Sequence, residues 1–533
     1  MYKRMTVLFC LMVAVAATLF FRLYYLTAGD SLSTAAKTQS SYTLDVVSER
    51  GTIYDRNLQP LTGNRERYIA AVMPCRQSLA ALSQELSGQR REQMIESFSD
   101  NRPFLIEVDS PDIYAYGVDV FKSSERYSSP QLAAHIIGHL QDGKGAYGIE
   151  RSYDEILSSC GSKVSISYAV DARKSPLAGV APAISRNYSG EGVVLTLDKE
   201  IQQLVEEAAG YYIEKGAVVV MDIHTGDIVA SASFPAFDPG DVSASMDAPG
   251  SPFVNRAFSA YNVGSTFKLL TAACALDSGI SENLGYECKG YIEIDSVRFN
   301  CHKLTGHSWL TMQRAIEQSC NPYFINLGQK LDPARYLELC RAVGFSRSIR
   351  LAPQLSTSAG TLPSVEALQN HAELANFSFG QGALTASPVQ IAQLICCIAN
   401  GGSAVSPHLV AGATADGETL SQENPATAPV RVISQNTAQI LQRMMVATVE
   451  EGSGQNAKPD IGSAGGKTAS AQTGIFLENG SEIVHAWFSG FYPAKDPKYA
   501  IVVLNEGGNS GGAVAAPVFR QVANGIQRLG KLS

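Results

Sequence analysis

The stretch Tyr261-Asn-Val-Gly-Ser-Thr-Phe-Lys-Leu-Leu270 places a serine, Ser265, three residues before a lysine, Lys268. The apolar run Leu269–Leu276 follows the lysine and predicts a buried helix that begins close to the serine. Residues three apart share one helix face, so the Lys268 amine can reach the Ser265 hydroxyl. A helix N-terminus favours developing negative charge, and a partly desolvated amine can lose its proton and act as a base. The stretch therefore predicts a nucleophilic serine with its base, if partners for the pair exist elsewhere in the chain.

Two further short motifs lie farther along the chain. Ser319-Cys-Asn321 follows a predicted helix, Met312–Gln318, and Lys467-Thr-Ala-Ser470 follows two glycines and precedes a predicted edge strand. Ser-x-x-Lys, Ser-x-Asn and Lys-Thr-x in this order are the motif set of the active-site-serine enzymes that interact with penicillin. The set is far more specific than any one member, and it predicts that the three motifs converge in one cleft.

The pattern of strands and helices around these motifs predicts one α+β domain that begins near residues 187–192. Two apolar runs joined by a tight turn predict an antiparallel hairpin, at Gly216–Ile223 and Asp227–Ser233. Two more strands are predicted at 486–492 and 499–505, and a last helix at 512–529. Strands at both ends with helices between them predict one antiparallel sheet covered by helices.

The first residues predict where the protein is located. Met1-Tyr-Lys-Arg4 is short and basic, and residues 5–27 form an apolar segment long enough to cross a bilayer if Arg22 snorkels to the far interface. Because basic flanks stay inside, we expect a cytoplasmic N-terminus (1–4), a single-pass anchor (5–27) and an extracytoplasmic body. A cleaved secretory signal is the alternative, since Ala14-Val-Ala16 resembles a cleavage site, and it leads to the same compartment.

The composition of the chain limits the possible fold class, number of domains and kind of partner. With 533 residues, 45% of them hydrophobic and 17% charged, the chain is globular and long enough for two or more domains. A net charge of −8 argues against nucleic acid as a partner, because phosphate binding needs a basic face. Residues 28–190 show mixed α and β patterns without a nucleophile or a ligand cluster. This segment is therefore predicted to be a non-catalytic α+β domain that serves as a spacer or for interaction.

Cysteine usage leaves one question open. Of the ten cysteines, Cys288 and Cys301 flank a predicted hairpin, where they can form a disulfide or remain free buried thiols. His302 and His307 follow Cys301, but these spacings match no standard zinc finger, and the chain has no His-Glu-x-x-His motif. The sequence therefore predicts no metal site, and it predicts no cofactor.

With these motifs the chain resembles the class B penicillin-binding proteins, the monofunctional D,D-transpeptidases that cross-link peptidoglycan. The similarity extends from Arg50-Gly-Thr-Ile-Tyr-Asp-Arg56 through Gly148-Ile-Glu150 and Asn255-Arg-Ala257 to Phe379-Gly-Gln-Gly382. It implies that residues 28–190 are the family's non-catalytic dimerisation or pedestal domain. It also implies that residues 191–533 are a transpeptidase domain of the penicillin-binding/β-lactamase-like fold.

The resemblance further implies the roles of the residues in the first two motifs. Ser265 attacks the carbonyl of the penultimate D-Ala of a stem peptide, and Lys268 accepts the proton of its hydroxyl. Ser319 relays a proton to the amine of the departing terminal D-Ala. Asn321 hydrogen-bonds the substrate amide and holds Lys268 in place.

The third motif is implied to bind the substrate. Lys467 and Thr468 bind the terminal carboxylate, the first by charge and the second by a hydrogen bond. The backbone N–H groups of Ser265 and Ser470 form the oxyanion hole. Ala469 stands where the family usually has glycine, so its methyl group is expected to affect the width of the cleft and the affinity for β-lactams.

The resemblance implies stem peptides and β-lactams as ligands, and the membrane, a SEDS-type glycan polymerase and other cell-wall or divisome proteins as partners. Two alternatives use the same motifs, a membrane-anchored serine β-lactamase and a D,D-carboxypeptidase that transfers the acyl group to water. A β-lactamase needs a group that activates water, for which Glu366 and Glu373 are the candidates that the sequence leaves open. A third alternative is a non-catalytic β-lactam-binding scaffold of a cell-wall complex.

Overall fold

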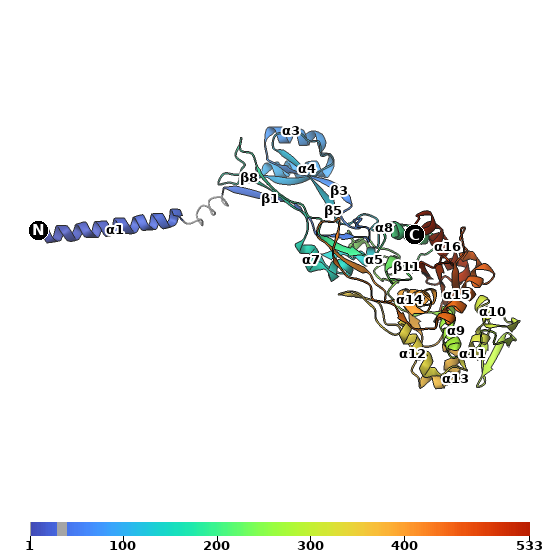
Figure 1. Ribbon diagram of the computed structural model, residues 1–533. Helices are drawn as coiled ribbons and strands as arrows, with labels where there is room; N and C mark the ends of the chain where they lie inside the picture. Colours follow the sequence, from blue (N-terminus) through green and yellow to red (C-terminus); the bar gives the residue numbers. More distant parts are fainter. Residues whose placement is uncertain (1, 29–39, 533) are drawn as a thin grey trace. The chain divides into compact units, whose positions relative to one another are not determined.

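The computed structural model describes residues 2–28 and 40–532, and it divides them into two compact units (Figure 1). We call them the N-terminal unit, which holds the described residues up to Arg50, Arg65–Arg126 and Gly161–Ser189, and the C-terminal unit, which holds Gly51–Asn64, Tyr127–Cys160 and the chain from Gly190 onward. This grouping differs from the expected division at residue 190. The reason is a parallel pairing of β2 (Thr52–Tyr54) with β10 (Gly192–Leu195), which brings an early segment into the later unit.

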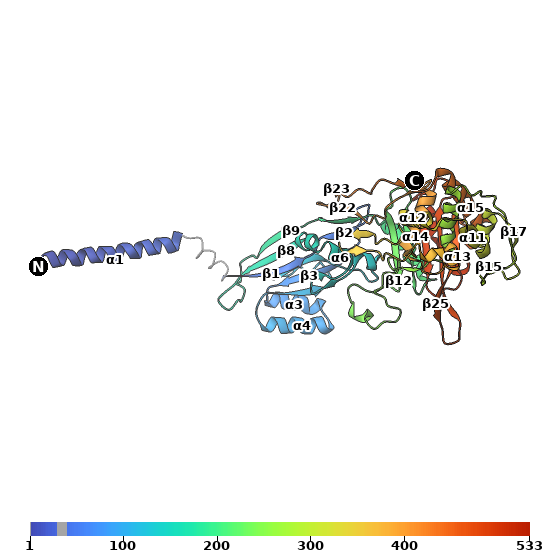
Figure 2. The ribbon, with the colours of Figure 1, turned by 90° about the horizontal axis from the view of Figure 1, so that it is seen from below.

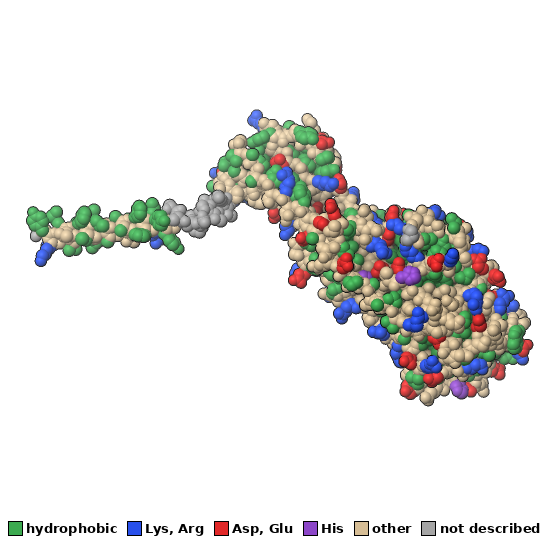
Figure 3. Space-filling model, in the orientation of Figure 1, with side chains coloured by type: hydrophobic (Ala, Val, Ile, Leu, Met, Phe, Trp, Pro, Cys, Tyr) green, Lys and Arg blue, Asp and Glu red, His purple; other side chains and the backbone are tan. Residues whose placement is uncertain are grey.

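The first element is one long apolar helix, α1 (Tyr2–Ala28). Its mean hydropathy is 2.2 over Tyr2–Tyr25, and apolar side chains cover the face seen in Figure 3. Length and composition make it a candidate membrane span, close to the predicted segment 5–27. Met1 and residues 29–39, which belong to the predicted cytoplasmic segment and the predicted non-catalytic domain, lie outside the described residues.

The N-terminal unit has a layered α+β structure. Its two three-stranded antiparallel sheets have the orders β1-β8-β9 and β4-β3-β5. Strand β3 alternates between two cores, because Ala71 packs toward β1 and β8 while Ala70 and Val72 pack against the helices. The bounds are β1 Ser41–Ser48, β3 Arg65–Val72, β4 Phe104–Val108, β5 Val118–Glu125, β8 Lys163–Ala169, β9 Ala183–Asn187, α3 Arg76–Glu85 and α4 Gly88–Ser99.

The C-terminal unit is built on a five-stranded antiparallel sheet with the order β12-β11-β27-β26-β25. The predicted hairpin is confirmed as β11 (Gly216–Asp222) and β12 (Ile228–Phe234), and the two later strands as β26 (Glu482–Tyr492) and β27 (Tyr499–Asn505). The strand at one edge of this sheet is β25 (Gly465–Phe476).

The motif that begins at Lys467 lies inside strand β25, so the prediction that it precedes the edge strand is wrong. The two preceding glycines do not interrupt the strand. A Cβ atom on Gly465 would lie 2.2 Å from the ring of Phe491, and one on Gly466 would lie 2.3 Å from the ring of Phe488. Glycine is needed at both positions because aromatic rings from β26 lie against the backbone. The strand therefore continues without a break, and Lys467 pairs with Ser489 of β26.

Helices cover both faces of the sheet (Figures 1 and 2). Alternate residues of β11 separate two cores, since Val218 and Val220 pack with α8 and α16, while Ala217 and Val219 belong to the core that contains α9 and α14. This is the α+β arrangement that the sequence predicts. The bounds are α8 Lys199–Gly210, α9 Lys268–Asp277, α14 Pro388–Ala399, α15 Gln435–Glu450 and α16 Ala516–Arg528.

The rest of the unit carries the second motif. Helix α10 (Met312–Glu317) ends just before Ser319, and α11 (Asn321–Gly328) begins just after it. The remaining main elements are the helices α5 Ala134–Ile137, α6 Gly148–Ser152, α7 Asp154–Ser159, α12 Pro333–Val343 and α13 His371–Ser378, and the strands β13 Tyr261–Asn262, β14 Tyr286–Cys288, β15 Tyr291–Ile294, β16 Val297–Asn300, β17 Ser308–Leu310, β20 Thr385–Ala386, β22 Val410–Thr414 and β23 Leu420–Glu423.

Candidate active site

Ser265 lies in a 3₁₀ turn, η2 (Gly264–Phe267), that runs directly into α9. Gly264 has a φ of +62°, and a Cβ atom on it would lie 3.0 Å from the Cβ of Ala471 on β25. The turn therefore needs glycine both for its backbone conformation and for its close approach to the edge strand. The predicted buried helix is confirmed, and it holds the partly exposed Ser265 at its start.

The side chain of Lys268 is fully buried, and its amine has several oxygen neighbours. Nζ lies 2.7 Å from Asn321 Oδ1, 2.8 Å from the Ser319 carbonyl oxygen, 3.0 Å from Ser265 Oγ and 3.2 Å from Ser319 Oγ. Burial lowers the pKa of Lys268 to about 7. A neutral amine has two hydrogens and one lone pair. The two shortest contacts are to oxygens that can only accept, so they take both hydrogens and leave the lone pair for the Ser265 hydroxyl proton.

Ser319 connects the first motif with the third. It has a left-handed backbone with a φ of +53°, and both its carbonyl oxygen and its hydroxyl lie within hydrogen-bonding distance of Lys268. Lys467 Nζ donates to Ser319 Oγ at 3.0 Å and to the Thr468 carbonyl oxygen at 2.8 Å. The Ser319 hydroxyl thus lies between two buried amines and can pass a proton from one side to the other.

Lys467 is as deeply buried as Lys268. Burial, together with repulsion by Lys268, lowers the pKa of Lys467 well below its usual value. Two amines that share one hydroxyl cannot both carry a full positive charge without a counter-ion. An anionic ligand close to Lys467 therefore favours the state in which Lys467 is charged and Lys268 is neutral.

A cleft of about 310 Å³ opens above these groups. Of the predicted site residues, Ser265, Ser319, Asn321, Thr468, Ala469 and Ser470 line it, and the two lysines lie beneath its floor. The prediction that the three motifs converge in one cleft is therefore confirmed in geometry. No Asp or Glu is among the described residues that line the cleft.

The cleft has five further lining residues that were not predicted from the sequence to belong to the site, namely His302, Gln318, Ser453, Ser510 and Gly512. Ser453 matters most, because its hydroxyl lies 2.8 Å from Thr468 Oγ1 and orients it. The sequence shows this serine between two glycines, as Gly452-Ser-Gly454. Its role in the site could not be inferred until the structure placed it beside Thr468.

Ala469 is only 3% exposed, and its side chain belongs to the main hydrophobic core. The backbone of Gly511 approaches it so closely that a Cβ atom on Gly511 would lie 2.4 Å from the Ala469 carbonyl oxygen. The methyl group of Ala469 thus packs with the core on the side of the strand away from free solvent. We therefore expect the Ala469 methyl group to affect ligand binding indirectly, by shifting the position of strand β25.

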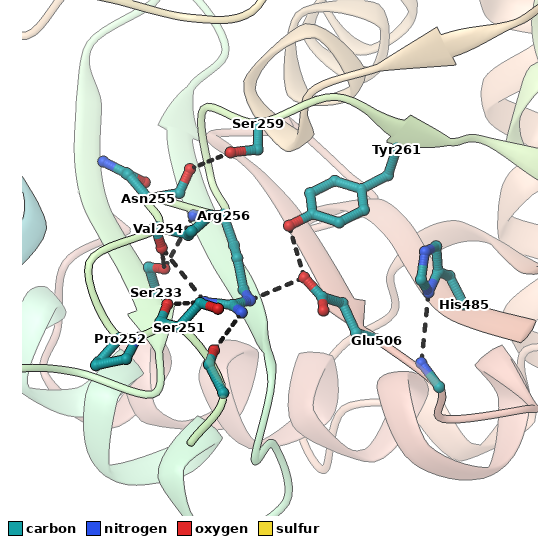
Figure 4. A network of polar contacts seen from close by, with 12 residues as sticks. Ser233, Ser251, Pro252, Val254, Asn255, Arg256, Ser259, Tyr261, His485 and Glu506 are labelled. Atoms are coloured by element: carbon teal, nitrogen blue, oxygen red, sulfur yellow. Dashed lines mark hydrogen bonds and ion pairs between the residues drawn. The ribbon is translucent and has the colours of Figure 1, made fainter. Parts of the chain in front are cut away.

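A polar network fixes the segment that leads to Ser265 (Figure 4). Arg256 is 4% exposed, and its Nε donates to Glu506 Oε1 at 2.8 Å. The hydroxyl of Tyr261 donates to the same oxygen at 2.6 Å, and the other guanidinium nitrogens donate to the carbonyl oxygens of Gly250 and Ser251. Glu506 therefore holds together the loop before the nucleophile, β13 and the end of β27.

Replacing Glu506 with glutamine should leave Arg256 as a buried cation without its counter-ion. Breaking a buried pair costs about 3–5 kcal/mol, and we expect about 2–3 here because Glu506 keeps one-fifth of its side-chain exposure. We predict a melting temperature lower by several degrees and penicillin acylation slower by roughly tenfold, through misplacement of Ser265. Differential scanning calorimetry and stopped-flow acylation measure the two effects. Glu207→Gln, an exposed carboxyl on α8, is the control, and equal values for both variants would contradict the role of Glu506.

Three cysteines and one histidine also converge behind the cleft. The ligand atoms of Cys288, Cys301, His307 and Cys320 all lie within 4.8 Å of one another. The predicted absence of a metal site rested on sequence spacing alone, and this arrangement runs against it. All cysteines are free thiols, so the optional bridge between Cys288 and Cys301 is not formed.

Comparisons with known proteins agree with this geometry. Residues 216–524 match the family model described as the penicillin binding protein transpeptidase domain. Stage V sporulation protein D of Bacillus subtilis is 30% identical over 93% of this chain and 80% of its own length. The peptidoglycan D,D-transpeptidase PbpA of Mycolicibacterium smegmatis is also 30% identical, over 76% of this chain and 86% of its own. The solved complex of penicillin-binding protein PBP2 with MreC from Helicobacter pylori shares the fold, with a TM-score of 0.67, 23% identity and coverage of 92% of this chain and 99% of that one.

Proposed function

The chain belongs to the class B penicillin-binding proteins, and from this premise we propose that it is a peptidoglycan D,D-transpeptidase whose acyl-enzyme forms on Ser265. One observation carries the proposal. Nζ of the buried Lys268 lies 3.0 Å from Ser265 Oγ and closer still to two acceptors, Asn321 Oδ1 and the Ser319 carbonyl oxygen, so a neutral amine donates to these two and directs its lone pair at the Ser265 hydroxyl. The same site binds penicillin, which acylates the serine in place of the stem peptide.

Acylation begins at Ser265. Its oxygen forms a bond to the carbonyl carbon of the penultimate D-Ala while its proton moves to Lys268. The backbone N–H groups of Ser265 and Ser470 stabilise the oxyanion, and losing one such donor typically costs roughly 10²–10³ in rate. Both residues line the cleft, as this role requires.

The leaving group departs through Ser319. When the carbon–nitrogen bond breaks, the terminal D-Ala needs a proton on its amine. The protonated Lys268 gives a proton to Ser319 Oγ, and the Ser319 hydroxyl gives its own to the amine, which restores a neutral Lys268. An amine from a neighbouring stem peptide then attacks the acyl-enzyme and reverses these proton transfers.

Lys467 and Thr468 receive the terminal carboxylate. The carboxylate supplies the counter-ion that Lys467 lacks, so substrate binding favours a charged Lys467 and, by repulsion, a neutral Lys268. Thr468 donates its hydroxyl to the carboxylate, and Ser453 holds that hydroxyl in position. Binding of the substrate thereby prepares the base.

The pKa of Lys268 predicts how the rate depends on pH. The neutral amine is required, and its pKa is lowered to about 7, so the active fraction falls as the pH drops below that value. We expect the second-order rate constant of penicillin acylation to decrease by up to about tenfold per pH unit on the acid side and to level off above it. Stopped-flow measurements from about pH 5.5 to about 8.5 test this, with circular dichroism to show that the fold persists. A rate that is flat or that rises toward acid would contradict the role of Lys268.

The cleft gives no support to the β-lactamase alternative. Glu366 and Glu373 are exposed and do not line the cleft, so neither is placed to activate water at Ser265. We expect nitrocefin to react in one stoichiometric burst followed by slow turnover, and rapid multiple turnover would favour a hydrolase. Carboxypeptidase activity uses the same acylation groups, and release of D-Ala from a stem pentapeptide without an acceptor amine measures its share.

Location and partners follow from the same premise. We propose that α1 is a single-pass anchor with a cytoplasmic N-terminus and that the chain from residue 40 onward is extracytoplasmic. The Helicobacter pylori relative was solved in complex with MreC, and a SEDS-type glycan polymerase is the partner that the family resemblance implies. The N-terminal unit, which has no catalytic motif, is the proposed contact for such cell-wall proteins. Alkaline phosphatase fused after residue 533 is active only outside the cytoplasm and therefore tests the orientation.

A further inference from the structure

The residues Cys288, Cys301, His307 and Cys320, which we call the thiol–imidazole cluster, come from four separate places in the chain. Cys288 ends β14, Cys301 follows β16, His307 precedes β17, and Cys320 lies between α10 and α11. The three cysteines are 0–2% exposed. Cys301 Sγ lies 3.4 Å from His307 Nδ1, and all four potential ligand atoms lie within 4.8 Å of one another.

The segment that supplies three of these residues has almost no hydrophobic core. Between Tyr286 and Leu310 the buried side chains are Cys288, Cys301 and Leu310, while the hairpin β15–β16 is half-buried or exposed. A small lobe of this kind cannot be held by apolar burial, and natural proteins stabilise such lobes with a disulfide or a structural metal. Because the cysteines are free thiols here, a structural metal is the stabilising element that these residues can provide.

Backbone hydrogen bonds also hold the side chains of Cys288, Cys301 and His307 close together. The amide of His307 donates to the Cys288 carbonyl oxygen at 3.1 Å, and the amide of Cys301 donates to the Gly290 carbonyl oxygen at 2.8 Å. These bonds hold the ends of the two hairpins side by side, so their sulfur and nitrogen atoms face one point.

We propose that the thiol–imidazole cluster binds one zinc ion, with the three cysteine sulfurs and one ring nitrogen of His307 as its ligands. Three sulfurs and one nitrogen form a closed structural zinc site, with no position left for water or substrate. Tetrahedral ligands lie roughly 3.3–3.8 Å apart, so the four atoms need only a small inward movement. Soft thiolates select zinc over magnesium or calcium. On binding, the protons of the three thiols pass to solvent, the zinc ion loses its bound waters, and three sulfur–zinc bonds and one nitrogen–zinc bond form.

The position of Cys320 links this zinc to the chemistry. Its neighbours on either side, Ser319 and Asn321, supply the oxygens that surround Lys268, and Ser319 also accepts from Lys467. A bond from Cys320 to zinc fixes this short segment, in which Ser319 has a left-handed backbone. The zinc is therefore a positioning element that never touches substrate. This consequence rests on the proposed function, whereas zinc binding itself does not.

The test measures metal and activity separately on the full chain, purified in detergent without chelators. Elemental analysis should find one zinc per chain in the wild type and in Cys75→Ser, whose half-buried thiol lies in the N-terminal unit. It should find a large loss of zinc in Cys288→Ser and in His307→Ala. In case these variants misfold, the wild-type protein reconstituted with cobalt should show the intense absorption of tetrahedral cobalt bound to thiolates.

Chelation of the wild-type protein should slow penicillin acylation at least about tenfold, and added zinc should restore it. Ser265→Ala should keep its zinc while losing acylation, which separates a failure of the zinc site from a failure of the proposed function. A wild-type chain that holds no zinc and shows no cobalt spectrum would overturn the proposal, as would a disulfide among the three cysteines. A zinc-bound chain whose acylation rate is unchanged by chelation would overturn the positioning role.

Discussion

Replacing Ser265 with alanine is expected to abolish covalent labelling by fluorescent penicillin. The substitution removes the proposed nucleophile, whose oxygen lies 3.0 Å from Lys268 Nζ, while Asn321 and the Ser319 carbonyl oxygen keep the amine in place. In serine hydrolases, loss of the nucleophile typically costs roughly 10⁶ in rate, so no adduct should form on the time scale of the experiment. Gel fluorescence and intact mass measure the adduct.

The matched control is Ser356→Ala, which removes an exposed serine from the same unit. It should label as fast as the wild type. Calorimetry should show similar melting temperatures for both variants, because a methyl group at position 265 requires no repacking. Labelling that survives in Ser265→Ala would remove this serine as the nucleophile and with it the proposed mechanism.

Replacing Lys268 with methionine should have the second largest effect. Methionine fills nearly the same volume in the buried site but cannot accept a proton. General base catalysis contributes about 10²–10⁴ in rate, so we expect the acylation rate constant to fall by that factor while the protein remains folded. Stopped-flow acylation with a chromogenic β-lactam measures the constant. The exposed Lys330→Met serves as the control and should have no effect.

Arginine at the same position separates charge from proton transfer. Its guanidinium stays protonated at every accessible pH, so Lys268→Arg keeps the positive charge but cannot act as a base. We expect it to be as slow as the methionine variant. An active arginine variant would mean that position 268 acts by charge alone, and the pH dependence expected from the lowered pKa would then have another origin.

The candidate active site was predictable from the sequence because local rules define each of its parts. A helix following Ser265, a motif at a helix junction and a lysine beside a sheet edge are each visible as short patterns. The error at Lys467 arose because two consecutive glycines usually end a strand. Here they admit the rings of Phe488 and Phe491, and such ring packing depends on which strand lies next to which.

The thiol–imidazole cluster could not be predicted from the sequence spacings that are typical of zinc motifs. Standard zinc motifs place ligands in close pairs, whereas here each ligand is separated from the next by a hairpin, a loop or a helix. Only tertiary structure brings Cys288 to Cys320. The cysteines and histidines near position 301 are visible in the sequence, but no local pattern connects them with Cys320, the proposed ligand that joins the cluster to the active site.

The division of the chain into units shows the same limit. Composition places the change of character near residue 190, and most of the C-terminal unit does begin there. The pairing of β2 with β10 joins residues far apart in sequence, and no local signal at Thr52 reveals its partner. The pairing of strands that are far apart in the sequence therefore could not be predicted from local sequence patterns.

The most direct test of the proposed acyl-transfer site is to identify which residue becomes acylated. The full chain is treated with penicillin, digested, and the adduct is located by tandem mass spectrometry. One adduct per chain is expected, on Ser265 within the peptide that also carries Lys268. An adduct on any other residue, or none in a folded and zinc-loaded chain, would contradict the claim that these motifs form an acyl-transfer site.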